Sequence, residues 1–212
     1  MRIILTELSC RDFAKELASK KPVPGGGGAA AMVAALGAAL NTMVANFSYG
    51  KKKFIDIKHK HEELINRGEI LRGKLIDLID KDAEYFEPLS RAYVMPSSTE
   101  EEKALKNETL QKCLIDACSA PMETIEFSYD AILLHEEIAN ISSKNIISDV
   151  GVGVQFLKAA LNSAYLNVLI NLNSIDDENY VKIQKEKSEK LVDTGTKIAD
   201  EVYEKVVTIL NQ

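Results

Sequence analysis

The sequence predicts an all-α protein, a bundle of about seven long helices. Apolar residues recur at steps of three and four along most of the 212 residues, the alternation typical of strands is nearly absent, and there are five prolines. Two segments, residues 29–47 and 149–172, are apolar around almost their whole circumference. We expect these two helices to form a central pair or to pack in an oligomer interface. The length suits one domain over residues 1–212.

The first helix is predicted to begin after Ser9, because Ser9 and Asp12 have the spacing of a helix cap, and to bury Phe13 and Leu17. A glycine loop and an alanine-rich buried helix follow, since alanine has the highest helix propensity. A third helix runs from about residue 54 to beyond residue 86. Its apolar stripe consists of Phe54, Ile57, Leu64, Leu71, Leu75, Leu78, Ile79 and Phe86.

Prolines and caps mark the later helices. Pro88 is expected to end or kink the third helix. Thr99 and Glu102 have the capping-box pattern that starts a fourth helix, and Pro121 suits the first turn of a fifth over residues 121–141. The sixth is the apolar segment 149–172. The last helix, capped by Asp176 or Asp177, is predicted to turn inward Tyr180, Ile183, Leu191, Ile198, Val202, Val206 and Ile209.

Residues 22–50 are the most informative segment, because these 29 residues carry no charge and include four consecutive glycines, Gly25, Gly26, Gly27 and Gly28. Glycines allow close approach of the backbone, and the start of a helix carries unpaired N–H groups with partial positive charge. Such a place can hold an anionic or polar ligand. A purely structural glycine loop before a core helix remains an equal alternative.

The same segment is long enough to span a membrane, which takes about 20 apolar residues. It is mostly alanine and glycine, however, and Asn41, Thr42 and Asn46 interrupt it. About twenty charged and polar residues come before it, unlike the arrangement in a signal peptide. We therefore predict a cytoplasmic protein without a membrane partner.

Composition excludes further classes. A net charge of −6 and a pI near 5.2 argue against nucleic-acid binding. Three cysteines predict free thiols in a reducing compartment. His59 and His61 are two residues apart and so do not share a helix face, and no metal site is predicted.

Asp82 is the first candidate for chemistry. Residues three, four and seven positions before it, and four after it, belong to the apolar stripe, so its carboxylate is predicted to lie on the buried face. Burial raises the pKa of a carboxyl toward the range of a general acid or base. A buried ion pair or a cap of another helix explains the pattern equally well.

The sixth helix offers a second group. Asp149, Asn167 and Asn171 lie on one face with small residues between them. The paired amides of Asn167 and Asn171 can recognise a flat polar ring. From the pattern alone, two hydrogen bonds to another helix are the favoured explanation of this pair, and a helix cap is the favoured role of Asp149. Lys51, with Lys52 and Lys53, is a solvated helix end or a site for a polycarboxylate tail.

Several segments in this order resemble the formiminotetrahydrofolate cyclodeaminase and methenyltetrahydrofolate cyclohydrolase family. They are PVPGGGGAAAMVAALGAALNTMVANFSYGKKKF (22–54), LIDKDAEYF (78–86), MPSSTEEEK (95–103), NIISDVGVGV (145–154) and AYLNVLINL (164–172). The resemblance covers nearly the whole chain and looks like the stand-alone form of the domain. The sequence departs from the family at Gly28, where the family usually has serine. Any role of the serine hydroxyl would have to be taken by backbone N–H groups here.

The resemblance implies an all-helical homodimer with a folate site beside the glycines. It implies that Asp82 is the catalytic residue and that Gly25 to Gly28, Lys51, Asp149, Asn167 and Asn171 bind substrate. The substrates would be tetrahydrofolate derivatives, including polyglutamylated ones, with no further cofactor. The activity would be conversion of 5-formiminotetrahydrofolate to 5,10-methenyltetrahydrofolate plus ammonia, hydrolysis of the methenyl compound to 10-formyltetrahydrofolate, or both. A non-catalytic folate-binding protein and a structural helical oligomer are the alternatives.

Overall fold

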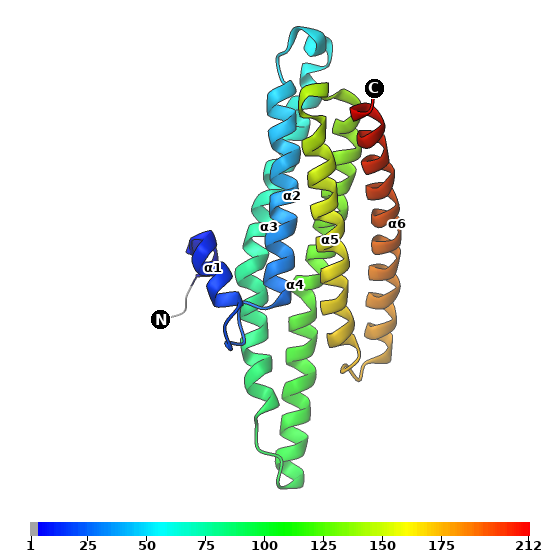
Figure 1. Ribbon diagram of the computed structural model, residues 1–212. Coiled ribbons are helices and arrows are strands. Elements are labelled where there is room, and N and C mark those ends of the chain that lie inside the picture. The colour runs from blue at the N-terminus through cyan, green and yellow to red at the C-terminus, as the bar shows by residue number, and fades with distance from the viewer. Residues whose placement is uncertain (1–3) are drawn as a thin grey trace.

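The computed structural model describes residues 4–212, which form six α-helices and three short 3₁₀ helices and contain no strand (Figure 1). The elements in chain order are η1 (Leu5–Glu7), α1 (Cys10–Leu17), α2 (Gly26–Ser48), η2 (Lys52–Ile57), α3 (Lys58–Tyr93), α4 (Glu100–Ile141), η3 (Lys144–Ile146), α5 (Ile147–Leu172) and α6 (Glu178–Leu210). The predicted all-α class is therefore confirmed.

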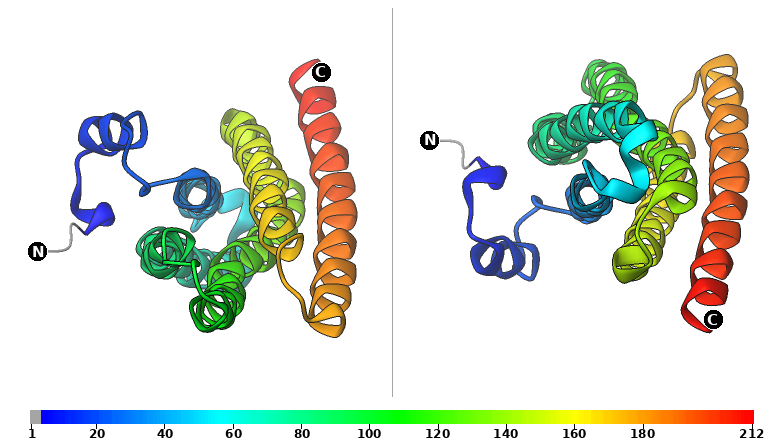
Figure 2. Two further views of the ribbon diagram at one scale, coloured as in Figure 1. Left: turned by 90° about the horizontal axis from the view of Figure 1, so that it is seen from below. Right: turned by 90° about the horizontal axis from the view of Figure 1, so that it is seen from above.

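Four helices form the body in two layers, as the end-on views show (Figure 2). Helices α2 and α5 lie side by side and run in opposite directions, and they pack on α3 and α4. Helix α6 covers α5 and α4 on one flank. On the other flank η1 packs against α3, where the carboxylate of Asp80 accepts hydrogen bonds from the backbone N–H of Leu5 (2.6 Å) and the hydroxyl of Thr6 (2.6 Å). Helices α2 and α5 thus pack as a pair, but along one side of the bundle rather than at its centre. The alternative, an oligomer interface, stays a prediction.

Several helix starts agree with the sequence. The hydroxyl of Ser9 accepts the N–H of Asp12, and Thr99 and Glu102 form a complete capping box. Asp177, rather than Asp176, caps the last helix. Caps depend on residues within one turn of each other, which is why sequence alone finds them.

The predicted number of helices was wrong. The predicted fourth and fifth helices are one continuous helix, α4, with Pro121 in its interior, and α3 continues through Pro88 to Tyr93. An interior proline costs roughly 3 kcal/mol of helix stability. Packing along these long helices outweighs that cost, because tertiary burial supplies most helical stability in proteins.

The burial predictions were wrong at element ends. Leu17, Phe86 and Ile183 were expected to face inward, but all three are exposed. Leu17 ends the short α1, Phe86 lies near the C-terminal end of α3, and Ile183 is in the second turn of α6. Apolar periodicity identifies a helix face, but the neighbouring helix does not reach every position on it.

Helix α2 is long and apolar enough to cross a membrane, with a mean hydropathy of 1.6 over its most apolar stretch. However, 61% of that stretch is buried inside the bundle. Packing against α3 and α5 therefore accounts for much of the apolar character that the sequence shows.

His135 joins three helices at the centre of the bundle. It is fully buried on α4, and its Nε2 lies 3.0 Å from the carbonyl oxygen of Gly37 on α2. A Cβ at Gly153 of α5 would collide with the imidazole ring, so this glycine allows the close approach. Burial lowers the pKa of His135 to about 4.

This histidine should make the fold sensitive to acid. The unfolded chain binds a proton at His135 below about pH 6.5, whereas the folded chain does so only below about pH 4. The free energy of unfolding should therefore fall by about 3 kcal/mol from this group as the pH drops through that window. Urea unfolding at pH 7 and pH 4.5 measures the loss, and His135→Gln should show a smaller one. An equal loss in both proteins would contradict the assignment.

Candidate functional site

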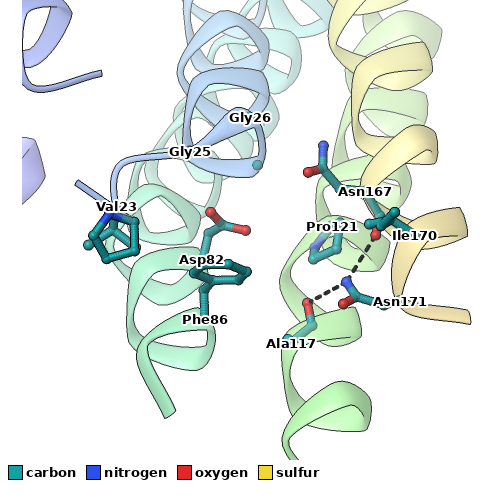
Figure 3. Close-up of a pocket in the computed structure, with 12 residues that line it drawn as sticks. Val23, Gly25, Gly26, Asp82, Phe86, Ala117, Pro121, Asn167, Ile170 and Asn171 are labelled. Carbon is teal, nitrogen blue, oxygen red and sulfur yellow. Dashed lines mark hydrogen bonds between the residues drawn. The ribbon is translucent and has the colours of Figure 1, made fainter. Parts of the chain in front are cut away.

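A cleft of about 220 Å³ opens where the N-terminal end of α2 meets α3, α4 and the C-terminal end of α5 (Figure 3). Asp82 and Phe86 of α3 lie on one side, and Asn167, Ile170 and Asn171 of α5 lie across from them. The remaining lining residues are Pro22, Val23, Gly25, Gly26, Gly27, Ala117 and Pro121. The structure thus brings together four segments that are far apart in the chain.

Asp82 is the acidic residue of this cleft. Its carboxylate is largely buried, and it faces the first turn of α2. Burial raises the pKa of Asp82 to about 6, and a hydrogen bond from the backbone N–H of Gly28 partly offsets that rise because it favours the ionised form. A carboxyl with this pKa can both accept and return a proton near neutral pH. The sequence left open that Asp82 caps another helix, and its carboxylate does contact the first turn of α2. This contact lies at the edge of an open cleft.

The four glycines are not a loop. Gly25 is the N-cap of α2, and the next three form its first turn. A Cβ at Gly27 would collide with the carboxylate of Asp82. A Cβ at Gly28 would lie 3.6 Å from the backbone oxygen of Ile79, an ordinary contact, so an alanine would fit there. Only Gly27 is therefore required by the carboxylate.

Asn167 and Asn171 bond to the backbone. The amide nitrogen of Asn167 donates to the carbonyl of Ser163 (2.8 Å), and that of Asn171 donates to the carbonyl of Asn167 (2.9 Å). These bonds leave the two Oδ1 atoms and one N–H of Asn167 as the amide groups that a ligand in the cleft can reach. The predicted inter-helix bond is present for Asn171 only.

That bond explains the proline inside α4. Pro121 has no N–H to donate to the carbonyl of Ala117, four residues earlier. Asn171 of α5 supplies the missing donor, with its amide nitrogen 3.5 Å from that carbonyl oxygen. Proline and asparagine together therefore keep α4 continuous at the cleft and fix one of its walls.

Lys51 and Asp149 lie elsewhere in the single chain. Lys51 follows the C-terminal end of α2, about 35 Å from the glycines by the rise per residue. Asp149 is in the first turn of α5, eighteen residues and about 27 Å from Asn167. Neither lines the cleft around Asp82. Their predicted roles in substrate binding are not tested by this arrangement of one chain.

Sequence reasoning missed six lining residues: Pro22, Val23, Phe86, Ala117, Pro121 and Ile170. Phe86 was assigned to the core, yet its exposed ring offers a flat apolar surface beside the carboxylate. Its place one turn after Asp82 was the available signal, since residues four apart share a helix face.

Within residues 4–212 no three histidine, cysteine, aspartate or glutamate side chains are grouped in a way that could hold a metal ion. The three thiols, Cys10, Cys113 and Cys118, are free, as predicted. A carboxyl of raised pKa, helix N–H groups, amide oxygens and an aromatic ring therefore define the cleft as an acid–base site for a small polar molecule.

Comparison with known proteins identifies the family. Residues 9–190 match the family described as formiminotransferase-cyclodeaminase. A methenyltetrahydrofolate cyclohydrolase of Methylorubrum extorquens is 36% identical over 94% of this chain and 96% of its own length. The crystal structure of formiminotetrahydrofolate cyclodeaminase from Thermotoga maritima is 33% identical, with a TM-score of 0.80, over 97% of this chain and 96% of that one. The chain belongs to the formiminotransferase-cyclodeaminase family.

The formimidoyltransferase-cyclodeaminases are longer proteins. That of Mus musculus is 34% identical over 82% of this chain but over only 32% of its own length. This chain therefore spans about a third of those relatives, whereas it matches the cyclohydrolase and the solved cyclodeaminase nearly end to end.

Proposed function

We propose that this protein is a folate one-carbon enzyme that acts on 5-formimino- or 5,10-methenyltetrahydrofolate. The observation that carries the proposal is Asp82, whose pKa is raised to about 6 by burial at an open cleft. Near end-to-end relatives named for cyclohydrolase and cyclodeaminase activities supply the substrate class. The ring of Phe86 and the amide oxygens of Asn167 and Asn171 suit a pterin, which has flat faces and polar edges.

In the deaminating direction, N10 of the folate attacks the carbon of the N5-formimino group. This attack closes the five-membered ring, and Asp82 accepts the proton from N10. Asp82 then returns the proton to the departing nitrogen, so that the carbon–nitrogen bond breaks, ammonia leaves and the methenyl group forms. One carboxyl serves both steps because, with a pKa of about 6, it can lose and regain its proton near pH 7. The reaction needs no cofactor.

In the hydrolytic direction, water attacks the methenyl carbon of the cationic ring. The ionised Asp82 accepts a proton from that water, and it also stabilises the positive charge of the bound substrate. The bond between this carbon and N5 then breaks as N5 takes a proton from Asp82 and the added hydroxyl loses its own proton, which gives 10-formyltetrahydrofolate and releases one proton in all. Both directions use the same carbon and the same carboxylate.

A direct assay tests the proposal. The pure protein is incubated separately with each compound while the absorbance of the methenyl chromophore is followed. Gain of absorbance with ammonia release from the formimino compound marks the cyclodeaminase, and faster loss of absorbance from the methenyl compound than in buffer marks the cyclohydrolase. Folate binding with neither change would support the non-catalytic alternative instead, and absence of binding would support a structural oligomer.

We further propose that the enzyme works as a cytoplasmic homodimer. Leu36 and Phe47 of α2 and Leu166 of α5 are exposed apolar side chains. One side of the α2–α5 pair is not covered by another helix of residues 4–212, which supports association between copies. Size-exclusion chromatography with light scattering measures the assembly, and a monomer at micromolar concentration would contradict it.

A further inference from the structure

Residues 4–24 form an arm that leads into α2 from outside the four-helix body (Figure 1). The arm consists of η1, α1 and the linker between α1 and α2. Helix α1 stands away from the body in all views, and Phe13 is the one buried side chain along its length (Figures 1 and 2). A segment with so few buried contacts opens at a low free energy unless another contact fastens it.

The carboxylate of Asp80 on α3 provides such a contact. It accepts the backbone N–H of Leu5 (2.6 Å), the hydroxyl of Thr6 (2.6 Å) and, more weakly, the backbone N–H of Thr6 (3.4 Å). The two N–H groups belong to the first turn of η1, where a helix has no acceptor of its own. Hydrogen bonds to a carboxylate are roughly twice as strong as those between neutral groups. Asp80 therefore holds the beginning of the arm on α3.

The segment that follows the arm is held at the same level of α3. Asp82, two residues after Asp80, accepts the backbone N–H of Gly28, and its carboxylate packs against Gly27. Side chains two positions apart point about 200° apart around a helix. The arm therefore passes around α3, with its beginning bound on one side of that helix and the start of α2 bound on the other.

The last residues of the arm form part of the cleft. Pro22 and Val23 line it, and Val23 lies on the same side as Asp82 and Phe86 (Figure 3). Gly25, two residues after Val23, is the N-cap of α2. The position of the arm thus determines both this wall of the cleft and the place where the first turn of α2 begins.

We propose that Asp80 is a positioning residue of the cleft: by fastening η1 to α3, it keeps Pro22 and Val23 in place as a wall beside Asp82. Asp80 is not among the residues of 4–212 that line the cleft, so it acts through the arm. The effect on turnover rests on the proposed function, whereas the effect on the arm does not. A carboxylate that only anchored η1 would leave the cleft unchanged, and the experiments below distinguish these roles.

Hydrogen–deuterium exchange with mass spectrometry tests the fastening without any assay of activity. Asp80→Asn keeps the shape of the side chain but loses its charge and one acceptor. Backbone exchange in residues 5–24 should become at least ~tenfold faster, the effect of losing one charge-assisted hydrogen bond, while α4 and α5 exchange as before. Asp77→Asn, the same change at an exposed position three residues earlier on α3, should leave the arm unchanged. Unchanged exchange of the arm in Asp80→Asn would overturn the proposal.

Thr6→Val tests the same contact from the side of the arm, because valine has the shape of threonine without its hydroxyl. This variant should also speed exchange of the arm. In the double variant with Asp80→Asn, it should add little, since the partner of the hydroxyl is already weakened. Fully additive effects would mean that the two residues act separately, which would contradict a shared contact.

The pKa of Asp82 reports whether the arm shapes the cleft. Asp82 is the one titratable side chain among the residues of 4–212 that line it, and burial, not a nearby charge, raises its pKa to about 6. The residues that α4 and α5 contribute carry no charge: they are Ala117, Pro121, Asn167, Ile170 and Asn171. A loosened wall admits water to the carboxylate, so Asp80→Asn should lower the pKa of Asp82 toward its ordinary value.

Carbon-13 NMR of protein labelled at its aspartate carboxyls measures this pKa, and Asp82→Asn identifies the resonance. Asp77→Asn should leave the pKa of Asp82 at its wild-type value. An unchanged pKa in an Asp80→Asn protein whose arm exchanges faster would show that the arm does not shape the cleft, and the positioning role would be overturned.

Kinetics with the folates give the second readout of the cleft. Asp80→Asn should raise KM about tenfold and change kcat less than about threefold, because it loosens a binding wall while Asp82 stays on α3. The rise of kcat/KM near pH 6 should move to lower pH, in step with the pKa of Asp82. Circular dichroism checks that the variant is folded, since a smaller folded fraction lowers the apparent kcat and leaves KM unchanged.

The outcomes separate the two proposals. If the wild-type protein turns over neither folate, the proposed function fails, and exchange of the arm together with the NMR titration still decides the role of Asp80. If the wild-type protein is active but KM and the pH profile of Asp80→Asn match those of Asp77→Asn, Asp80 is only an anchor of η1 and this inference is overturned.

Discussion

Asp82→Asn is expected to lower turnover at least ~100-fold with the fold intact, the usual scale for loss of a general acid–base group. Asparagine has nearly the same shape but can neither accept the proton from the nucleophile nor return it. Steady-state rates with both folates measure the loss. In the wild-type protein, kcat/KM should rise across about pH 6 as Asp82 ionises. Near wild-type turnover in the variant would remove Asp82 from the mechanism.

The same substitution should stabilise the protein at high pH. Folding raises the pKa of Asp82 from 3.8 to about 6, so the folded chain binds the proton more tightly and the ionised carboxylate opposes folding above about pH 6. Asparagine removes that cost. The free energy of unfolding should increase by up to about 3 kcal/mol at pH 8, and this gain should disappear near pH 4. A less stable variant at pH 8 would mean that contacts of the ionised carboxylate outweigh its burial.

Sequence was sufficient where the determinants are local. The caps at Ser9, Thr99 and Asp177 involve neighbours within one turn, and all three are present. The position of Asp82 on the buried side of α3 follows from the apolar residues around it, because helical periodicity fixes which residues share a face. The pKa of about 6 that burial produces at Asp82 agrees with that reasoning.

Sequence was insufficient where a distant residue changes a local rule. Pro121 has the pattern of a helix start, but Asn171, fifty residues later, donates to the carbonyl that the proline leaves free, so α4 continues. The glycines looked like a loop, although three of them form a helical turn against Asp82. In both cases the decisive contact is tertiary, and no local pattern encodes it.

Gly27→Ala is expected to lower turnover about 100-fold, although the change adds a single methyl group. That methyl would occupy the place of the Asp82 carboxylate, which must then rotate or shift away from the first turn of α2. A displacement of about 1 Å at the reacting group can cost ~100-fold in rate. Steady-state kinetics should show the loss mainly in kcat.

The neighbouring glycines provide matched controls for this prediction. A Cβ at Gly26 would lie 3.5 Å from Oδ1 of Asn167, and a Cβ at Gly28 would lie 3.6 Å from the oxygen of Ile79, so both alanines fit. Gly28→Ala should keep most of the activity and raise the free energy of unfolding by about 0.5 kcal/mol, since alanine loses less backbone entropy than glycine in a helix. Equal losses of turnover in Gly27→Ala and Gly28→Ala would contradict this prediction. They would mean that the activity depends on the flexibility of the whole turn and not on the contact between Gly27 and the carboxylate.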